Sequence, residues 1–464
     1  MSEEPPEKPR AKDDEANRLG RRVRRYAQVG AGVGGIAARA AGGRLFGVNT
    51  FNDRTARELK SALGGLKGPI MKVAQMIATI PDAVPAEFAA ELAELQSAAP
   101  PMGWPFVKRR MRAELGPGWE ARFKSFEREA AAAASLGQVH RATALDGTLL
   151  AVKLQYPDMQ SAVDADLRQL GLIFSIHRRM DRAIDTREMY AEIGERLREE
   201  LDYEREAAHM RLYAHIFAED ARVAVPDVYA DLSTKRLLTM GWLDGEPLLD
   251  FREHKMAARN AIAETMFAAW WLPFSRFGVI HGDPHLGNYT VRSGSSSGEW
   301  GINLLDYGCI RVFPPAFVAG VVELYRALET SDRDRAAAAY ENWGFRNLSR
   351  ELIDTLNVWA RFIYAPMLDD RVRSVADGIR PGEYGRKEAF AVHKRLRELG
   401  PVTPPREFVF MDRAAIGLGA VFLHLGAELN FHRLFNEAIE AFDTATLDKR
   451  QSAALKKAGV PLVA

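Results

Sequence analysis

Residues 148–156 constrain the fold most, because they alternate as a β-strand and carry a lysine in the middle. Large aliphatic side chains fall on one face of this strand, whereas Ala151 and Lys153 fall on the other, since successive side chains point to opposite faces. Lysine is rarely buried unless its ammonium group is paired. The pattern therefore predicts a strand whose second face meets solvent, a partner carboxylate or an anionic ligand.

Strand patterns come first in the chain and helical patterns come later. Residues 138–144 read as a strand that forms a hairpin with 148–156, and residues 235–242 read as another strand. A long helix is expected over residues 255–277, and the pattern is helical from residue 315 to the end. This order predicts an α+β protein with a small strand-bearing lobe and a larger helical lobe.

Two polar turns lie downstream of the lysine strand. Residues 281–288 read His-Gly-Asp-Pro-His-Leu-Gly-Asn, which keeps the spacing between the catalytic Asp and the metal-binding Asn of protein kinases, here Asp283 and Asn288. Asp306 follows a predicted strand and precedes Tyr-Gly, as a magnesium-binding Asp does. Phosphoryl transfer needs a cation on the phosphates, oxygen ligands for magnesium and a group beside the nucleophile. The sequence therefore predicts a nucleotide site in which Asp283 is catalytic and Asn288 and Asp306 bind magnesium.

Lys153 supplies the cation of this predicted site. Its ammonium group would hold the phosphates, and Glu206, on a predicted helix, would hold the lysine side chain extended. Each residue also has a simpler interpretation. Lysine can lie along a strand edge with its charge in water, and Asp, Asn and Gly are common turn residues. The joint order and context of the four elements favour the site.

Bulk composition excludes several classes of function. The 63 Lys and Arg residues balance 62 Asp and Glu residues, which gives no argument for a nucleic-acid partner. Cys309 is the single cysteine, so neither an internal disulfide nor a cysteine-based zinc site is expected, and we expect a reducing compartment, the cytoplasm. No stretch approaches the roughly 18 apolar residues that span a bilayer. Arginines before the Gly/Ala-rich run 29–41 leave three interpretations open: peripheral contact with an anionic membrane, packing as a homodimer, or a solvated helix end.

Further motifs carry a family resemblance. Residues 72–75 read Lys-Val-Ala-Gln, residues 131–134 are alanines followed by Ser-Leu-Gly-Gln-Val-His, and residues 200–203 read Glu-Leu-Asp-Tyr. With the site above, these motifs make the chain resemble the UbiB/AarF family of atypical, protein-kinase-like proteins over residues 20–440. The resemblance implies a bilobal kinase-like fold with a small N-lobe sheet, a mostly helical C-lobe and an N-terminal helical extension.

The resemblance also implies domain boundaries. We expect a disordered tail over 1–19, the helical extension over 20–104, the N-lobe with inserted helices over 105–243, the C-lobe over 244–445 and a C-terminal tail over 446–464.

Site residues follow from the same resemblance. Lys72 of the extension would meet Glu200 or Asp202, and Gln75 would point at the nucleotide. The alanine-rich loop replaces a glycine-rich one and would change how the γ-phosphate is held, because alanine restricts the backbone. The nucleotide-binding residues implied in this way are Ala132, Ala133, Ala134, Ser135, Leu136, Ala151, Lys153, Met240 and Trp242.

Two positions depart from the family pattern. In the family, the extension folds across the place where a protein substrate would dock and so is inhibitory. Ala74 stands where the family has glycine, so the resemblance does not carry this inhibitory role over to the present chain. Gly241 stands where many relatives have an acidic hinge residue, but a hinge recognises adenine through its backbone, so nucleotide binding should survive.

The resemblance implies an ATP-dependent enzyme that binds ATP or ADP with Mg²⁺. In the first hypothesis it is an ATPase or phosphotransferase coupled to a lipid or to a protein of isoprenoid-quinone (ubiquinone) metabolism. Two alternatives stay open: a small-molecule kinase of the aminoglycoside- or choline-kinase type, and a non-catalytic nucleotide-sensing scaffold.

Overall fold

The computed structural model describes residues 102–462, apart from 135, 158, 162, 165–166, 168–186, 294–299, 377, 380–384 and 400–405. The expected tail and nearly all of the expected helical extension, including Lys72, Ala74 and Gln75, lie outside the described residues. Ser135 of the predicted nucleotide loop lies outside them too.

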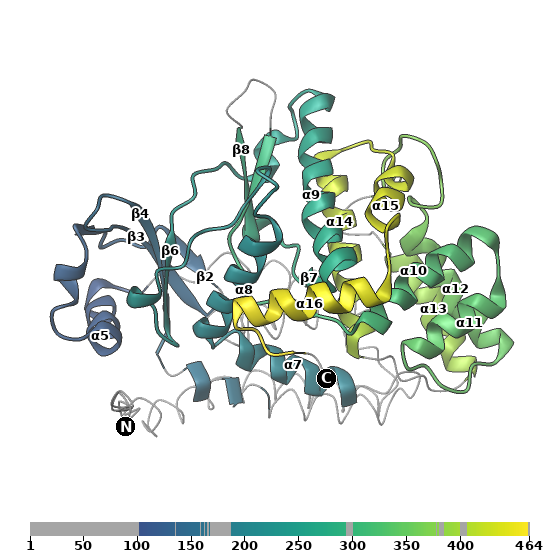
Figure 1. Cartoon of the computed structure of the whole chain (residues 1–464), viewed down its shortest axis with the longest axis horizontal. Coiled ribbons are helices and arrows are strands. Elements are labelled where there is room, and N and C mark those ends of the chain that lie inside the picture. Colours follow the sequence, from purple (N-terminus) through teal and green to yellow (C-terminus); the bar gives the residue numbers. More distant parts are fainter. Residues whose placement is uncertain are drawn as a thin grey trace, which may run out of the picture.

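A small lobe built around an antiparallel sheet and a larger helical lobe make up the described chain (Figure 1), which confirms the expected α+β organisation. In the small lobe the strand order is β1-β3-β4-β6, and β2 also pairs with β3. These strands are β1 (Ser125–Phe126), β2 (Ala132–Ala134), β3 (Gly137–Thr143), β4 (Leu149–Gln155) and β6 (Leu237–Gly241), and helix α5 (Trp104–Leu115) belongs to the same lobe.

The predicted hairpin around the lysine strand is confirmed. β3 pairs with β4 so that Val139 lies opposite Lys153. Leu150, Val152 and Leu154 are fully buried in the core of the small lobe. Ala151 instead joins the larger hydrophobic cluster on the other side of the sheet. The alternation of β4 thus turns Lys153 away from the small-lobe core and toward the rest of the molecule.

One local prediction is wrong. The alanine-rich segment was expected to be a loop, but Ala132–Ala134 form strand β2, which pairs with β3 from Val139 to Gly137. Alanine has little preference for strands, yet the neighbouring strand β3 offers backbone partners: the Ala131 N–H donates to the Val139 carbonyl over 2.8 Å. Tertiary pairing decides the structure here.

Two small sheets lie in the larger lobe and carry the polar turns. β7 (Val279–His281) pairs antiparallel with β10 (Ile310–Val312), and His281 lies opposite Ile310. A second sheet has the order β5-β9-β8, with β5 (Val223–Ala224), β9 (Trp300–Leu304) and β8 (Tyr289–Ser293). Because Asp283 and Asn288 lie between β7 and β8, and Asp306 lies between β9 and β10, these sheets hold both turns close together.

Helices form the remainder of the larger lobe. The long predicted helix is confirmed as α9 (Met256–Phe277), and it ends at Gly278, whose φ of 61° is the left-handed conformation that glycine favours at a helix end. The other described helices of eight or more residues after the small-lobe hairpin are α7 (Arg187–Glu199), α8 (Tyr203–Ile216), α10 (Pro315–Thr330), α11 (Arg333–Asn342), α12 (Arg350–Tyr364), α13 (Arg386–Leu399), α14 (Arg406–Leu425), α15 (Phe431–Ile439) and α16 (Thr444–Ala458).

The segment set apart as a C-terminal tail is largely the helix α16, which packs against α8, α9 and α10 (Figure 1). Gln451 of α16 is buried, and its side-chain amide donates to the carbonyls of Phe277 over 2.8 Å and Phe313 over 2.9 Å. The helix α8, within the segment expected to form the N-lobe, buries Met210 and Tyr213 in the larger hydrophobic cluster. Helix α8 is therefore anchored on the larger lobe.

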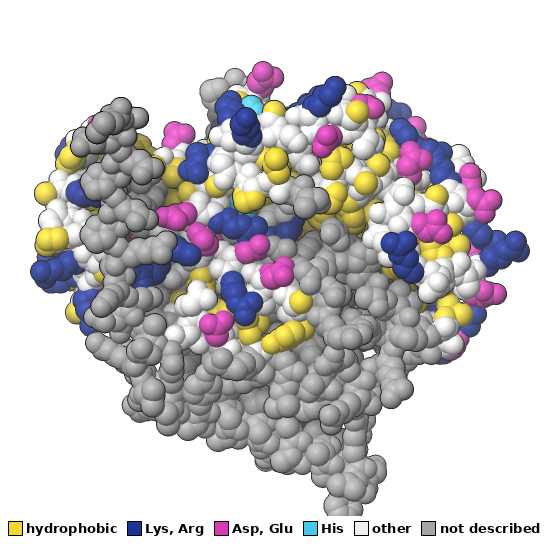
Figure 2. All heavy atoms as spheres, turned by 60° about the horizontal axis from the view of Figure 1, so that its bottom comes forward, with side chains coloured by type: hydrophobic (Ala, Val, Ile, Leu, Met, Phe, Trp, Pro, Cys, Tyr) yellow, Lys and Arg dark blue, Asp and Glu magenta, His cyan; other side chains and the backbone are white. Residues whose placement is uncertain are grey.

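Positive and negative side chains are mixed over the face seen in Figure 2, as the balanced charge of the sequence leads us to expect. Within the described ranges, no helix is both long enough and apolar enough to cross a membrane.

Candidate active site

Lys153 contacts two carboxylates that come from distant parts of the chain. Its Nζ lies 2.7 Å from Glu206 Oε1 on α8 and 3.4 Å from Asp306 Oδ2 after β9. The side chains of Lys153 and Glu206 are 10% and 4% exposed, whereas that of Asp306 is 33% exposed. The pairing of Lys153 with Glu206, predicted from the sequence, is thus present in the structure, and Asp306 lies beside it on the open side.

The electrostatics of this group favour a charged lysine. Burial lowers the pKa of the Lys153 ammonium, but the negative charges of Asp306 and Glu206 outweigh burial and raise that pKa well above its usual value. Burial raises the pKa of the Glu206 carboxyl, and the lysine charge opposes this shift. The ammonium group is therefore held as a fixed positive charge in a nearly dry site, where a cation attracts phosphate oxygens most strongly.

His281 connects the two polar turns. Its Nε2–H donates to the Asp306 carbonyl over 2.8 Å, and its Nδ1 accepts from the Asp283 N–H over 3.2 Å. These two partners require the neutral imidazole with the proton on Nε2. Trp270 on α9 donates its indole N–H to the carbonyl of His281 over 2.9 Å. His281 therefore braces the loop, while His285 is exposed.

Asn288 lies in the same turn as Asp283. Its Nδ2 donates to the Asp283 carbonyl over 2.8 Å, which leaves Oδ1 as the amide atom that a metal would bind. The Leu305 N–H donates to the carbonyl of Asn288 over 2.9 Å, so Asn288 is tied to the residue that precedes Asp306. The structure thus links the side chains or backbones of Lys153, Asp306, Asp283 and Asn288 through direct contacts or through His281.

Asn288 and Asp306 suit magnesium by the chemistry of their oxygen donors. In the part of the chain that the structure describes, no group of three or more His, Cys, Asp or Glu side chains could hold a metal ion by itself. Magnesium commonly reaches such sites with one or two protein ligands together with the phosphates of its nucleotide. The residues present therefore fit a metal that arrives with a nucleotide.

The two acids expected to face Lys72 lie in different surroundings. Glu200 is buried, and its carboxylate accepts from the Cys309 thiol over 3.4 Å, just after the Asp306 turn. Asp202 caps the N-terminus of α8: its carboxylate accepts from the Arg205 N–H over 3.1 Å and lies 3.6 Å from Lys235 Nζ. Of the two, Glu200 is the one beside the predicted metal-binding turn.

The predicted nucleotide-binding residues that the structure describes do not all lie on the face that carries Lys153. Ala151 and Met240 are register partners on β4 and β6, so they lie side by side on that face. Trp242, at the hinge, donates its backbone N–H to Leu149 and its indole N–H to Asp244. Ala132 and Ala133 are exposed and Ala134 is partly exposed in β2, whereas the Leu136 side chain is buried in the small-lobe core.

Comparison with known proteins places this site in a family. Residues 94–340, just over half of the 464-residue chain, match the model of the ABC1 atypical kinase-like domain. The chain belongs to the ABC1 atypical kinase-like family. The resemblance to the UbiB/AarF proteins is thereby confirmed, and with it the kinase-like class of fold.

The proteins that this chain is similar to align with different shares of its length. The yeast protein "Atypical kinase COQ8, mitochondrial" (Saccharomyces cerevisiae) is 24% identical over 433 residues, which are 90% of this chain and 84% of that protein. The Xenopus laevis "AarF domain-containing protein kinase 1" is 28% identical over 284 residues, 61% of this chain and 55% of that protein. The structure of Rv3197 with erythromycin, from Mycobacterium tuberculosis, has a TM-score of 0.55 and 27% identity, and the match covers 83% of this chain and 96% of that one.

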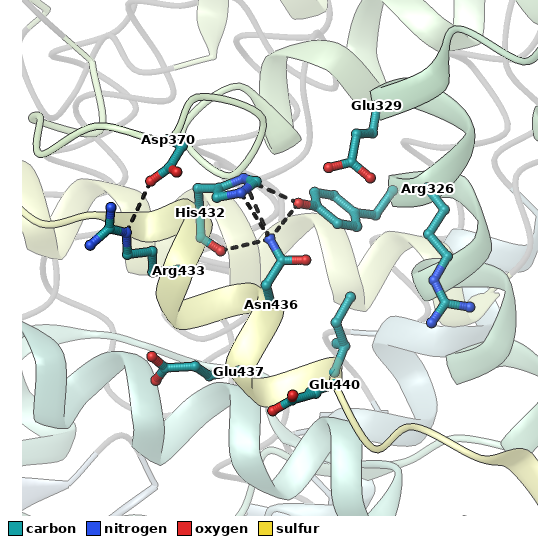
Figure 3. A pocket seen from close by; sticks show the side chains of 10 residues that line it. Arg326, Glu329, Asp370, His432, Arg433, Asn436, Glu437 and Glu440 are labelled. Atoms are coloured by element: carbon teal, nitrogen blue, oxygen red, sulfur yellow. Dashed lines mark hydrogen bonds and ion pairs between the residues drawn. The ribbon is translucent and has the colours of Figure 1, made fainter.

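A separate cavity of about 410 Å³ lies in the helical lobe of this ABC1 family chain (Figure 3). Tyr325, His432 and Asn436 are hydrogen-bonded to one another within it, and Asn436 Nδ2 donates to the Tyr325 hydroxyl over 2.8 Å. None of the predicted site residues line it, and its four carboxylates outnumber its two guanidinium groups; these charged residues are Glu329, Asp370, Glu437, Glu440, Arg326 and Arg433. Like charges repel, so this acidic lining does not suit a triphosphate. The kinase-like site is where the predicted residues meet.

Tyr203 is a site residue that the sequence reasoning did not assign. It lies one helical turn before Glu206, and its ring centroid is 5.2 Å from Lys153 Nζ. Residues three apart on a helix share a face, so its spacing from Glu206 was the signal that could have identified it.

Proposed function

We propose that this chain binds Mg–ATP in the cleft between its lobes and hydrolyses it, as an atypical kinase-like ATPase. The observation that carries this proposal is the position of Lys153. Its ammonium group lies between a buried carboxylate, Glu206, and a partly exposed one, Asp306, on the face of the sheet that also carries Ala151 and Met240. Membership of the ABC1 family supports the same interpretation.

Each residue of the site has a distinct role in this proposal. Lys153 attracts the phosphates, and Glu206 fixes its direction because the two side chains are 2.7 Å apart in a buried site. Asn288 and Asp306 hold magnesium, which neutralises charge on the phosphates. Asp283 orients the attacking water or hydroxyl group, while His281 fixes the backbone of Asp283 relative to Asp306.

We further propose that the activity serves lipid or isoprenoid-quinone metabolism, in association with a lipid or protein partner of that pathway. This part rests on the family and on relatives such as the yeast protein named COQ8. That relative's name places it in mitochondria. For this chain, a cytoplasmic location with peripheral membrane contact remains a prediction.

Thermal unfolding with and without Mg–ATP tests nucleotide binding. A ligand present at 100 times its Kd stabilises a folded protein by about 2.7 kcal/mol, which raises the midpoint of unfolding. We expect wild type to show this increase and Asp306→Asn to lose its magnesium-dependent part. Asp334→Asn, an exposed position on α11, is the matched control. An unchanged increase in Asp306→Asn would count against the proposed metal site.

Product analysis tests the reaction. Release of inorganic phosphate from ATP, measured with and without anionic liposomes and in Lys153→Arg, should depend on Lys153 and increase with liposomes. Stoichiometric transfer of phosphate to an alcohol would identify a small-molecule kinase instead. Tight nucleotide binding without turnover under either condition would identify a nucleotide-sensing scaffold.

A further inference from the structure

Tyr203 carries a buried hydroxyl group with no hydrogen-bond partner among the described residues. The residue is 2% exposed and is the first residue of α8. Its ring centroid lies 5.2 Å from Lys153 Nζ, so it shares the buried end of the lysine site with Glu206. A buried hydroxyl without a partner destabilises a folded protein, and such groups call for an explanation.

The surroundings of the hydroxyl place it beside the predicted phosphate loop. A Cβ atom added at Gly137 would lie 2.9 Å from the Tyr203 hydroxyl and would collide with the carbonyl oxygen of Leu154. Gly137 begins β3, where it lies opposite Ala134 of β2 and has Gln155 as its register partner on β4. Gln155 and Lys153 are two residues apart on β4, so they point to the same face of the sheet. Gly137 is the register partner of Gln155 and therefore lies on that face too.

The order of residues along β4 shows which part of a bound nucleotide would lie near Tyr203. Ala151, Lys153 and Gln155 follow one another on this face, since side chains alternate along a strand. Ala151 adjoins the hinge residue Met240, and Lys153 marks the phosphates. Gln155 and its partner Gly137 therefore lie further from the hinge than Lys153 does, and Tyr203 lies against Gly137.

We propose that Tyr203 is a phosphate-binding residue of the nucleotide site, whose hydroxyl donates a hydrogen bond to the phosphate chain beyond the oxygen atoms held by Lys153. This inference rests on the proposed function. A side chain at Gly137 would meet the Leu154 carbonyl first and would also crowd this hydroxyl. The inference makes Tyr203 a residue that distinguishes nucleotides by their phosphates and not by their base.

Burial keeps this hydroxyl in its donor form, because it raises the pKa of Tyr203 above its ordinary value. The Lys153 ammonium group has no acceptor atom, so it cannot accept a hydrogen bond from this hydroxyl. A phosphate oxygen, in contrast, is a charged acceptor, and hydrogen bonds to charged groups are stronger than neutral ones.

Tyr213 provides a matched control on the same helix. It is fully buried, and its hydroxyl also has no partner in the described part of the chain. Its ring packs against Phe217 and Tyr307, with centroids 5.9 and 5.6 Å away. Replacing either tyrosine by phenylalanine removes one buried unpaired hydroxyl, but only Tyr203 contacts the lysine site.

The experiment compares Tyr203→Phe, Tyr213→Phe and wild type by isothermal titration with Mg–ATP and with adenosine. We expect Tyr203→Phe to weaken Mg–ATP binding about tenfold, which equals about 1.4 kcal/mol. Adenosine affinity should stay the same, and the unfolding midpoint without nucleotide should be equal or higher. Tyr213→Phe should bind both ligands as wild type does.

Three results would overturn the inference. If Tyr203→Phe bound Mg–ATP with the affinity of the wild type, the hydroxyl would make no contact with the phosphates. Equal losses for adenosine and Mg–ATP would show that the hydroxyl only supports the small lobe. A wild-type protein that binds no Mg–ATP would refute the proposed function and this inference together, whereas the first two results refute the inference alone.

Discussion

Replacing Lys153 by methionine should destabilise the protein strongly, because it leaves the Glu206 carboxylate buried without its cation. Glu206 is 4% exposed, and Lys153 Nζ lies 2.7 Å from it. Removing one partner of a buried ion pair typically costs about 3–5 kcal/mol of unfolding free energy. Methionine has a similar length and apolar stem, so lost packing should contribute little.

The loss should depend on pH in a defined direction. Without the lysine, burial raises the pKa of Glu206 in the folded state above its value in the unfolded state. Stability from such a group is fully present below the unfolded pKa and is lost as pH rises through the folded pKa. Lys153→Met should therefore recover stability on moving from pH 8 to pH 5.5, by up to about 1.4 kcal/mol for each pH unit in which Glu206 titrates.

Urea unfolding followed by tryptophan fluorescence measures these free energies. The double variant Lys153→Met/Glu206→Gln should be less destabilised than the single one, since it carries no buried charge at this pair. A single variant as stable as wild type at pH 8, or a double variant no more stable than the single one, would refute the assignment of Glu206 as a buried, lysine-dependent carboxylate.

Two further predictions concern the supports of the site. His209 donates to the Tyr307 carbonyl, and burial together with the Arg205 charge lowers its pKa to about 3. As pH falls, the histidine is therefore protonated in the unfolded chain before it is protonated in the folded one, which should reduce the unfolding free energy by about 1.4 kcal/mol between pH 7.5 and pH 5.5. His209→Asn should show a smaller change over that range in urea titrations. An identical change would contradict the assignment of His209 as a buried, neutral residue. Gln451→Leu leaves the buried carbonyl of Phe313 and the partly buried carbonyl of Phe277 without their donor, and should cost about 2 kcal/mol in the same assay. Lys456→Leu, exposed on the same helix, is its control, and an equal loss in both variants would be the contrary result.

The sequence predicted the parts of the fold that have strong local patterns. The alternation around Lys153 predicted the hairpin of β3 and β4, and the helical pattern over residues 255–277 predicted α9. The polar turns at Asp283 and Asp306 were recognisable because their spacing follows from the ligands that magnesium and phosphate require.

Structure that depends on distant partners was not predictable in the same way. Strand β2 consists of alanines and exists because β3 pairs with it. Strands β5 and β10 are two and three residues long, too short for any periodicity to be read. Apart from its three-residue spacing from Glu206, Tyr203 looks like an ordinary aromatic residue in the sequence, and its position against Gly137 and Lys153 marks it as part of the site.

Because of helix α16, the proposed nucleotide site should be completed only late in protein synthesis. It packs on α8, the helix that carries Glu206, and the contact between Lys457 of α16 and His215 of α8 joins residues 242 positions apart. At about 5–20 residues per second, a ribosome needs on the order of 10–50 seconds to travel that distance. During this interval α8 has already been synthesised, but α16, which packs against it, has not. A nascent chain should therefore gain the firmly held lysine–glutamate pair only after α16 has left the ribosome.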